Sequence, residues 1–478
     1  MGPWSKHLRT TAILLALVAL LVACLPGSDQ QAGDGDQGAG GGDEDTGDAT
    51  AGTGGTEEGV DDGTEDGTED GTEDQAGGDG GTLVVWDQWA RGVEGDVVDQ
   101  LNAEFSDEHG VTVQRETKTL DDLNATIGLA MGQPDGPDVA QVNQGRADMG
   151  ALVEAGLLMD LSAAAEERGW TERFSENLLN RNMFSEDGAQ FGTGNLYGIA
   201  PQAEVVGWYY NKATFDELGL EVPTTFDELA ALLGQIAEAG ETPITFGNLD
   251  AWPAIHTYGA VEHVFVDTGY LNDFIFNLGD AGFDRPENVE AAEIVQTWVD
   301  EGYFTENFEG IGYDDSWAQF AAGEGALMLT GSWISGELDQ DGYGFFLTPG
   351  EAAGDVVPQI GGQGVPLAVR ADTEMGEAAV DYLDWMVSER AAQLWAEAGG
   401  LPSGEPPEGA VVDQTLLADV VDGWQTTLES DQVGHYLDWA TPTFYDTLTA
   451  ELQLLLSSSV EPQAFVDTLE QDYQASSG

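Results

Sequence analysis

The chain has 478 residues, of which 89 are acidic and only 13 are Lys or Arg, so its formal net charge is −76. Such a charge excludes nucleic acid as a partner, because no basic patch exists to neutralise phosphates. The length allows two domains, and the single cysteine excludes an intrachain disulfide bond.

Residues 1–24 are typical of an export signal. Lys6 and Arg9 precede an unbroken apolar run over residues 12–22, which is too short to span a bilayer and fits a signal peptide. The run ends in Leu21-Val22-Ala23-Cys24, which resembles a bacterial lipobox. This predicts a lipoprotein in which Cys24 is lipidated and becomes the mature N-terminus. The alternative is an ordinary signal peptide with an incidental thiol.

Residues 25–82 form a low-complexity segment of Gly, Asp, Glu and Thr, with three tandem GTED units over residues 63–74. Because it has almost no apolar side chains and strong like-charge repulsion, it cannot offset the entropy of ordering. We therefore predict a disordered acidic tether between a lipid anchor and a globular body. An acidic interaction tail is the alternative.

The body that begins at Leu83 still carries a net charge of about −60. Self-repulsion on this scale destabilises a compact state unless salt screens it. We therefore expect a halophilic acidic protein, exported into a salty medium. Because acids are so common, two carboxylates that are near each other in sequence are weak evidence for catalysis.

The first part of the body alternates between strand and helix patterns. Apolar runs predict strands at residues 83–86 and 111–113, and a Pro-Asp-Gly-Pro turn leads into a third strand that ends at Asn143. Helical spacing covers residues 94–109, 120–131 and 145–161. This alternation predicts an α/β fold with a mostly parallel sheet and helices on both faces.

Residues 196–253 read as strand, helix, helix and strand. A strand over residues 204–210 and a helical pattern precede Thr225 and Glu228, whose spacing predicts a capping box at the start of a helix that runs to Gly240. A short apolar strand over residues 243–246 then opens into the loop 247–253, which holds an amide, a carboxylate and an indole. Such strand-end loops bind ligands in open α/β sheets.

Short motifs follow one another through nearly all of residues 83–478. They lie at residues 86–89, 136–139, 156–161, 210–212, 222–225, 247–253, 320–328, 330–333, 364–369, 378–395 and 398–400. The ordered set resembles family 1 extracellular solute-binding proteins, the sugar-binding lipoproteins of ABC importers, of which maltose-binding protein is a relative.

This resemblance implies a two-lobe periplasmic-binding-protein-like fold with a multi-strand hinge and an interlobe ligand cleft. Lobe one would comprise residues 83–201 and 347–398, and lobe two residues 202–346 and 399–478, with the lobes closing on the ligand. The implied protein is a monomer without catalytic activity or cofactor, lipid-anchored on the outer face of the cytoplasmic membrane. It would capture a mono- or oligosaccharide and deliver it to the permease subunits of an ABC transporter.

A sugar presents a rim of hydroxyls and two faces of C–H bonds, so aromatic rings, carboxylates and amides should surround it. The resemblance places Trp333 where a ring stacks on the sugar and Glu204 where a carboxylate contacts its hydroxyls. The further candidates at strand ends and turns are Gln88, Trp89, Asn143, Asn248, Asp250, Trp252 and Gln363, and Trp424 in the last part of the chain could supply a second stacking ring although no motif anchors it. In the alternative interpretation, the tryptophans belong to the core, Asn248 caps a turn and Asp250 caps the following helix.

Two other functions remain open at this point. The first is a secreted glycoside hydrolase with Glu204 and Asp250 as its carboxylate pair, although no hydrolase motif surrounds them. The second is the same fold binding a non-sugar solute; the few Lys and Arg near the motifs argue against phosphorylated ligands. We expect no metal site, because the histidines are scattered and the pair His256 and His263 lacks a third ligand.

Overall fold

Two larger β-sheets, a two-stranded one and their covering helices make up the described part of the body. The computed structural model describes residues 80–476, which belong to one unit running from Asp74 to Gly478. The predicted signal peptide, Cys24 and almost all of the predicted tether lie outside the described residues. No helix within residues 80–476 has the length and apolar character needed to cross a membrane.

The first sheet has the strand order β10-β3-β1-β2. β1 (Thr82–Asp87) pairs in parallel with β2 (Thr112–Thr117) and with β3 (Val139–Gln141), whereas β10 (Leu367–Val369) is antiparallel to β3. Alternate residues of β1, including Leu83 and Val85, enter a core shared with α1 (Gly92–His109), α13 (Gly376–Met386) and α14 (Glu389–Glu397). The predicted parallel sheet is therefore present, with one antiparallel strand added from far along the chain.

The second sheet is organised around β6 (Ala203–Asn211), which is buried along most of its length. β6 is antiparallel to β7 (Leu327–Gly331), β8 (Tyr343–Phe346) and β9 (Gln359–Gln363), and β11 (Val433–Gly434) lies parallel to β9. A near-continuous apolar strand of this kind is typical of a sheet that is covered on both faces.

The other elements surround these sheets. Near the first sheet lie α2 (Leu120–Met131), η1 (Arg146–Gly150), α3 (Ala151–Glu154), α4 (Ser162–Glu167), α5 (Trp170–Arg173), α6 (Glu176–Leu179), η2 (Asn180–Asn182) and the hairpin of β4 (Met183–Phe184) with β5 (Asn195–Leu196). Around the second sheet lie α7 (Lys212–Leu218), α8 (Phe226–Ala239), α9 (Pro253–Glu262), α10 (Thr268–Ile275), α11 (Pro286–Asp300), η3 (Phe308–Gly310), α12 (Tyr313–Ala321), η4 (Ser332–Glu337), α15 (Leu416–Glu429), η5 (Leu437–Trp439), α16 (Phe444–Leu456) and α17 (Pro462–Ser476).

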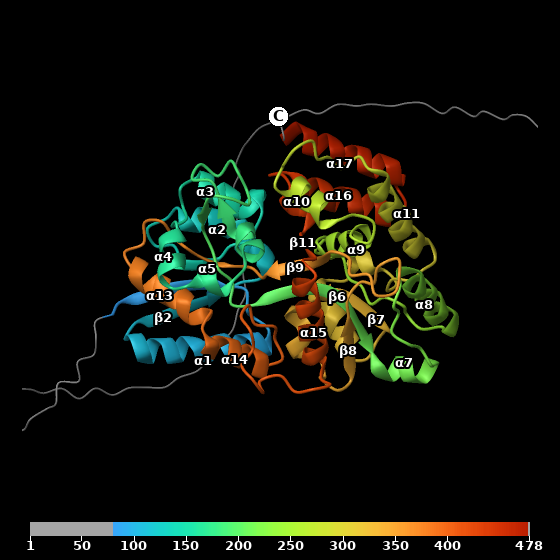
Figure 1. Cartoon of the computed structure of the whole chain (residues 1–478), viewed down its shortest axis with the longest axis horizontal. Coiled ribbons are helices and arrows are strands. Elements are labelled where there is room, and N and C mark those ends of the chain that lie inside the picture. Colours follow the sequence, from blue (N-terminus) through green and yellow to red (C-terminus); the bar gives the residue numbers. More distant parts are fainter. Residues whose placement is uncertain (1–79, 477–478) are drawn as a thin grey trace, which may run out of the picture. The chain divides into compact units, whose positions relative to one another are not determined.

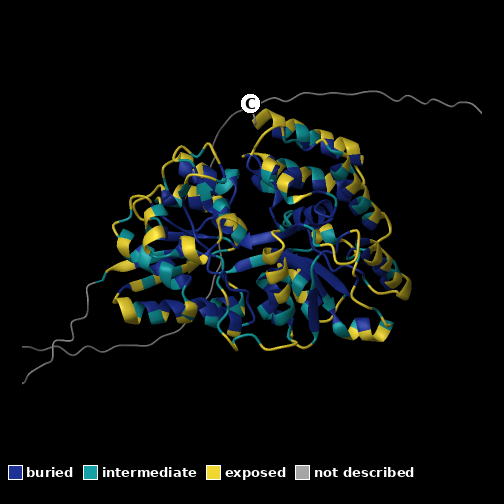
Figure 2. Ribbon diagram, viewed as in Figure 1, coloured by how far each residue is buried: buried dark blue, intermediate teal, exposed yellow. Residues whose placement is uncertain are grey.

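Figure 1 shows two groups of elements, one around each sheet, with β9 placed between them. Figure 2 shows that buried residues fill the strands and the inner helix faces of both groups, while exposed residues cover the outer helix faces. β10 and β9 both come from the range predicted for lobe one, but β9 pairs with β6. The predicted lobe boundaries stay a prediction, and the range 347–398 supplies one strand to each of the two sheets.

Three local predictions differ from the structure. Thr225 caps α8 as predicted, since its hydroxyl accepts from the Glu228 amide (3.2 Å), but the Glu228 carboxylate accepts from the amide and hydroxyl of Thr224 instead (both 2.8 Å). Residues 243–246 make only isolated bridges at Ile244 rather than a strand. The helix predicted over residues 145–161 is the short pair η1 and α3, which ends before Gly156, a residue in the left-handed region (φ 68°).

Candidate functional site

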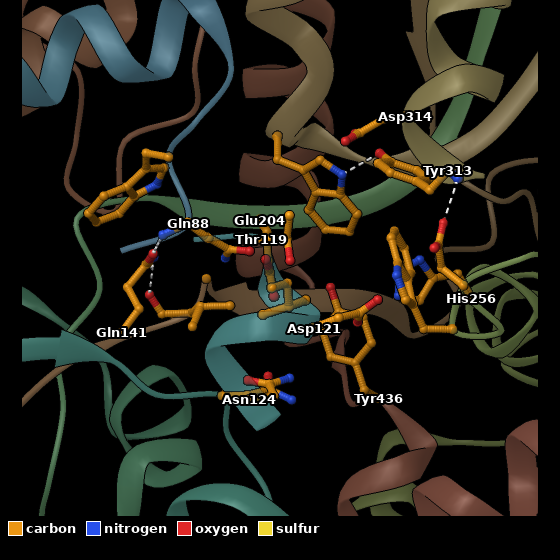
Figure 3. Close-up of a pocket in the computed structure, with 18 of the residues that line it drawn as sticks. Gln88, Thr119, Asp121, Asn124, Gln141, Glu204, His256, Tyr313, Asp314 and Tyr436 are labelled. Carbon is orange, nitrogen blue, oxygen red and sulfur yellow. Dashed lines mark hydrogen bonds between the residues drawn. The ribbon is translucent and has the colours of Figure 1, made fainter. Parts of the chain in front are cut away.

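A cavity of about 450 Å³ is lined by residues from both groups of elements. This volume lies within the range of small-molecule sites. One side consists of residues that follow the carboxyl ends of β1 and β3 together with the first turn of α2, where open α/β sheets bind ligands. The opposite side comes from the start of β6, the loop into α9, the start of α12, η4 and the segment around η5. Figure 3 shows Gln88 and Gln141 across the cavity from His256 and Tyr313.

Seven of the ten predicted ligand residues line this cavity, although they are spread over about 250 positions of the sequence. They are Gln88, Trp89, Asn143, Glu204, Asp250, Trp252 and Trp333. The fold therefore brings together the predicted aromatic and carboxylate side chains, while their contact with a ligand stays a prediction.

The turn after β1 is held rigidly by Arg115. Its guanidinium donates to the Asp87 carboxylate (2.7 and 2.8 Å) and to the Trp89 carbonyl (2.6 Å). The Trp89 indole donates to the side-chain oxygen of Gln202 (2.9 Å). The backbone amide of Gln88 donates to the side-chain oxygen of Gln141 (2.7 Å). Trp89 lines the cavity although it is only 4% exposed, and the Gln88 side chain makes no hydrogen bond among the described residues, so it stays available for a ligand.

The opposite side contains an aromatic cluster of Trp252, His256, Tyr313, Trp333 and Tyr436. The ring centroids of Trp252 lie 4.4 Å from Tyr313 and 6.3 Å from Trp333, and His256 lies 5.2 Å from Tyr436. The Trp333 indole donates to the Tyr313 hydroxyl (2.5 Å), and the Tyr313 amide donates to the Asp250 carboxylate (2.7 Å). These bonds fix the rings while Trp252 and Trp333 stay partly exposed, which suits them to cover the face of a ligand.

Trp333 also depends on the glycine two residues before it. The indole lies so close to Gly331 that a Cβ atom at position 331 would overlap the ring. Gly331 ends β7, which is paired with β6. The indole of Trp333 therefore needs a residue without a side chain at position 331. The periodicity of helices and strands in the sequence does not reveal this requirement.

Glu204 lies at the start of β6 on the floor of the cavity. Burial raises the pKa of this carboxyl to about 7, while the Tyr436 hydroxyl and the Arg181 guanidinium counteract the rise. The group is therefore close to its midpoint at neutral pH. Once ionised, its oxygens are strong acceptors for ligand hydroxyls.

His256 is a neutral polar group in the aromatic cluster. Burial lowers the pKa of its imidazole to about 3, so it carries no charge at neutral pH. It is 7% exposed and makes no hydrogen bond to another residue within the described part of the chain. Its ring nitrogens can therefore donate to, or accept from, a polar group inside the cavity.

Acidic groups outnumber basic groups around the cavity. Burial and the neighbouring Asp250 raise the pKa of Asp121, and burial raises the pKa of Asp438 to about 7. The two cations among the described lining residues are already paired. The Arg91 guanidinium lies 3.0 Å from the Glu94 carboxylate, and the Lys118 ammonium lies 2.5 Å from the Glu116 carboxylate. The same ammonium also lies over the ring of Trp86. A negatively charged ligand would therefore meet carboxylates and no free cation among the described lining residues.

The structure places Asn248, Gln363 and Trp424 outside the lining of this cavity. The Asn248 side chain accepts from the Ala254 amide at the start of α9 (3.0 Å), so Asn248 takes the helix-capping role that was weighed for Asp250, whereas Asp250 lines the cavity and accepts from the Tyr313 backbone amide. The Gln363 side-chain oxygen accepts from Asn182 (2.8 Å) and the Ala200 amide (3.3 Å). Trp424 belongs to α15 and packs in the core against β8 and its neighbours.

Sequence reasoning missed other lining residues. The polar and aromatic ones include Thr119, Asp121, Asn124, Gln141, Gln144, Gln202, Tyr313, Asp314, Asp315, Tyr436, Asp438, Trp439 and Tyr445. The turn ahead of α2 and the strand end before Asn143 were available signals for some of them. No local signal marks Tyr436, which reaches the cavity only through tertiary packing. Within residues 80–476, no three acidic or histidine side chains are grouped as metal ligands.

The sequence matches the family model described as bacterial extracellular solute-binding protein over residues 100–411. A multiple sugar-binding protein of Streptococcus mutans is 27% identical over 219 residues, 43% of this chain and 51% of that protein. An ABC transporter extracellular-binding protein of Pyrococcus horikoshii is 26% identical over 58% of this chain and 63% of its own length. The chain thus spans 51% and 63% of the length of these two relatives.

Solved structures share the fold. A chitin oligosaccharide binding protein has a TM-score of 0.71 at 19% identity and covers 83% of this chain and 99% of its own. RafE of Streptococcus pneumoniae, solved with raffinose, has a TM-score of 0.66 at 21% identity over 83% of this chain and 100% of its own. These similarities confirm the predicted two-lobe α/β fold class, and the match over most of the body confirms the resemblance. The chain belongs to the bacterial extracellular solute-binding protein family.

Proposed function

We propose that this protein captures a mono- or oligosaccharide in the cavity and delivers it to the permease of an ABC transporter. The observation that carries the proposal is the aromatic cluster beside Glu204. Partly exposed indoles, a half-buried carboxylate and the unbonded imidazole of His256 stand around one cavity. Rings that cover C–H faces and acceptors that meet hydroxyls are the two surfaces that a sugar requires. Relatives described as sugar-binding support the same ligand class.

The acidic groups around the cavity favour uncharged sugars over negatively charged ones as ligands. Arg91 and Lys118 are engaged by Glu94 and Glu116, so no free cation among the described lining residues could neutralise a uronate or a sugar phosphate. Like charges that are brought together in a partly buried site are strongly unfavourable. Neutral sugars meet no such penalty.

The cellular setting of this function is also part of the proposal. The family is extracellular, and the lipobox-like motif ending at Cys24 with the acidic segment after it supports a lipid anchor and tether on the outer face of the cytoplasmic membrane. The protein would act as a monomer with no chemical step. The charge of the body supports a source adapted to high salt.

A thermal-shift panel of sugars in concentrated salt tests the proposal. A sugar that binds only the folded state at a hundredfold excess over Kd stabilises it by about 2.7 kcal/mol. We expect at least one neutral sugar to raise the melting temperature, while glucuronic acid and glucose 6-phosphate leave it unchanged. A panel in which no neutral sugar stabilises the protein, or in which the acidic sugars stabilise it best, would contradict the proposal.

A further inference from the structure

Arg181 is a buried cation without an ion-pair partner in the described part of the chain. It lies on η2, is 0% exposed and does not line the cavity. Its Nη1 donates to the Gly361 carbonyl, whereas Nε and Nη2 have no hydrogen-bond partner among the described residues. Burying a charge in this way is costly: burial lowers the pKa of Arg181 to about 10, while Glu204 and Tyr436 counteract this.

The register of β6 and β9 places the Arg181 guanidinium beside Glu204. Glu204 lies directly opposite Gly362 in this antiparallel pair, and opposed residues project from the same face of a sheet with Cβ atoms about 5 Å apart. Gly362 has a φ of 142°, and a Cβ atom at this position would overlap Nη1 of Arg181. Because residue 362 is a glycine, the Arg181 guanidinium occupies the space that a side chain would fill there. It therefore lies beside Glu204, the residue opposite Gly362 on β6.

The other groups around Arg181 and Glu204 supply no second cation. The ring centroid of Trp439 lies 5.7 Å from the Arg181 guanidinium. His435 stays neutral because burial, Arg181 and His263 all lower the pKa of its imidazole. Burial and the Glu204 carboxylate raise the pKa of Tyr436, so its hydroxyl stays protonated. Asp438 lines the same cavity and Asp250 faces it from the loop before α9, and both are acidic. Among the described groups, Arg181 is the cation that opposes the burial of Glu204.

We propose that Arg181 is a positioning residue for ligand binding, which acts through Glu204 by keeping this carboxylate ionised and in place on the cavity floor. It does not contact the ligand itself. The consequence for ligand binding rests on the proposed function, whereas the coupling between Arg181 and Glu204 exists in the free protein.

The pKa of Glu204 determines how ligand affinity should change with pH. Protonation of Glu204 as the pH falls through about 7 turns one of its acceptors into a donor, so ligand affinity should decrease on the acidic side. Removal of the Arg181 charge leaves the Tyr436 hydroxyl as the group that still counteracts the effect of burial on Glu204. This removal should move the midpoint of Glu204 upward by about one pH unit or more, the usual effect of losing a nearby opposite charge.

The direct test is carbon-13 NMR of the free, full-length protein with labelled glutamate carboxyls, in which the Glu204 signal is assigned by its loss in Glu204→Gln. We expect a midpoint near neutrality in the wild type, a higher midpoint in Arg181→Met and a nearly unchanged one in Arg181→Lys. The affinity for a sugar that stabilises the wild type should shift with the same midpoints, and Glu204→Gln should remove the part of this pH dependence that belongs to Glu204, while the part due to Asp438, whose pKa is also about 7, remains. Equal midpoints in the wild type and in Arg181→Met would overturn the proposal.

A second measurement needs no substitution of Arg181. The nitrogen-15 Nε signal of Arg181 in the wild type should titrate with the Glu204 midpoint and should stop doing so in Glu204→Gln. An Arg181 signal that does not change with pH overturns the proposal even if Arg181→Met fails to fold. If Arg181 and Glu204 titrate together but no sugar binds, the positioning inference stands for the free protein and the proposed function fails.

Discussion

Replacing Trp333 with alanine should weaken sugar binding by about 30- to 150-fold, the loss expected when a central aromatic contact worth about 2–3 kcal/mol is removed. Trp333 is partly exposed to the cavity, and its indole nitrogen is fixed on the Tyr313 hydroxyl (2.5 Å). The substitution removes the ring and also frees Tyr313. Isothermal titration calorimetry with a sugar that stabilises the wild type measures the loss.

Trp385 provides the matched control. Its indole is also partly buried and donates to the Leu101 carbonyl (3.0 Å), but it lies on α13 outside the cavity lining. Trp385→Ala should lower the melting temperature and leave the affinity unchanged. Gly331→Ala keeps the Trp333 indole but displaces it, because the new Cβ atom overlaps the ring, and it should weaken binding as well. An affinity that Trp333→Ala leaves unchanged would show that the cavity binds its ligand in another way.

Transfer to low salt should unfold the protein. The body carries a net charge of about −60, and its ion pairs engage only a few of the many carboxylates in the described residues. The Debye length shortens from about 10 Å at 0.1 M salt to about 3 Å at 1 M, so the repulsion between surface carboxylates decreases steeply over this range. We expect the free energy of unfolding to rise by several kcal/mol between about 0.1 M and 3 M KCl.

Circular dichroism melts over a series of KCl concentrations measure this change. Sucrose serves as the control, because it stabilises by exclusion from the protein surface without screening charge. We expect KCl to restore the fold where sucrose restores little of it. A melting temperature that does not depend on KCl, or that depends equally on sucrose, would contradict the salt-adaptation proposal.

The sequence predicted the fold class because local patterns and family motifs agree over almost the whole body. Helix α2 and the three strands β1 to β3 follow from hydrophobic spacing and turn residues, which act over a few positions. Residues 243–246 looked like a strand for the same reason. Their neighbours around Phe304 and Leu327 allow only isolated bridges, and such long-range pairing cannot be read from a short apolar run.

The candidate site was predictable where side chains stand at strand ends or in motifs. Trp333, Glu204 and Asp250 line the cavity in this way. Asn248 differs because its side chain caps α9, and Trp424 differs because an indole on an amphipathic helix serves the core equally well. Tyr436 and Arg181 could not be predicted. They reach Glu204 through the pairing of β6 with β9 and the packing of η5, and both are contacts between distant parts of the chain.

The measurement that tests the central claim most directly is calorimetric titration of neutral oligosaccharides into the protein in concentrated salt, followed by analysis of the sugar. Our account predicts saturable one-to-one binding, weakened by Trp333→Ala, and recovery of the sugar intact. Release of new reducing ends by the wild type, lost in Glu204→Gln, would instead identify a glycoside hydrolase and contradict the assignment as a binding protein.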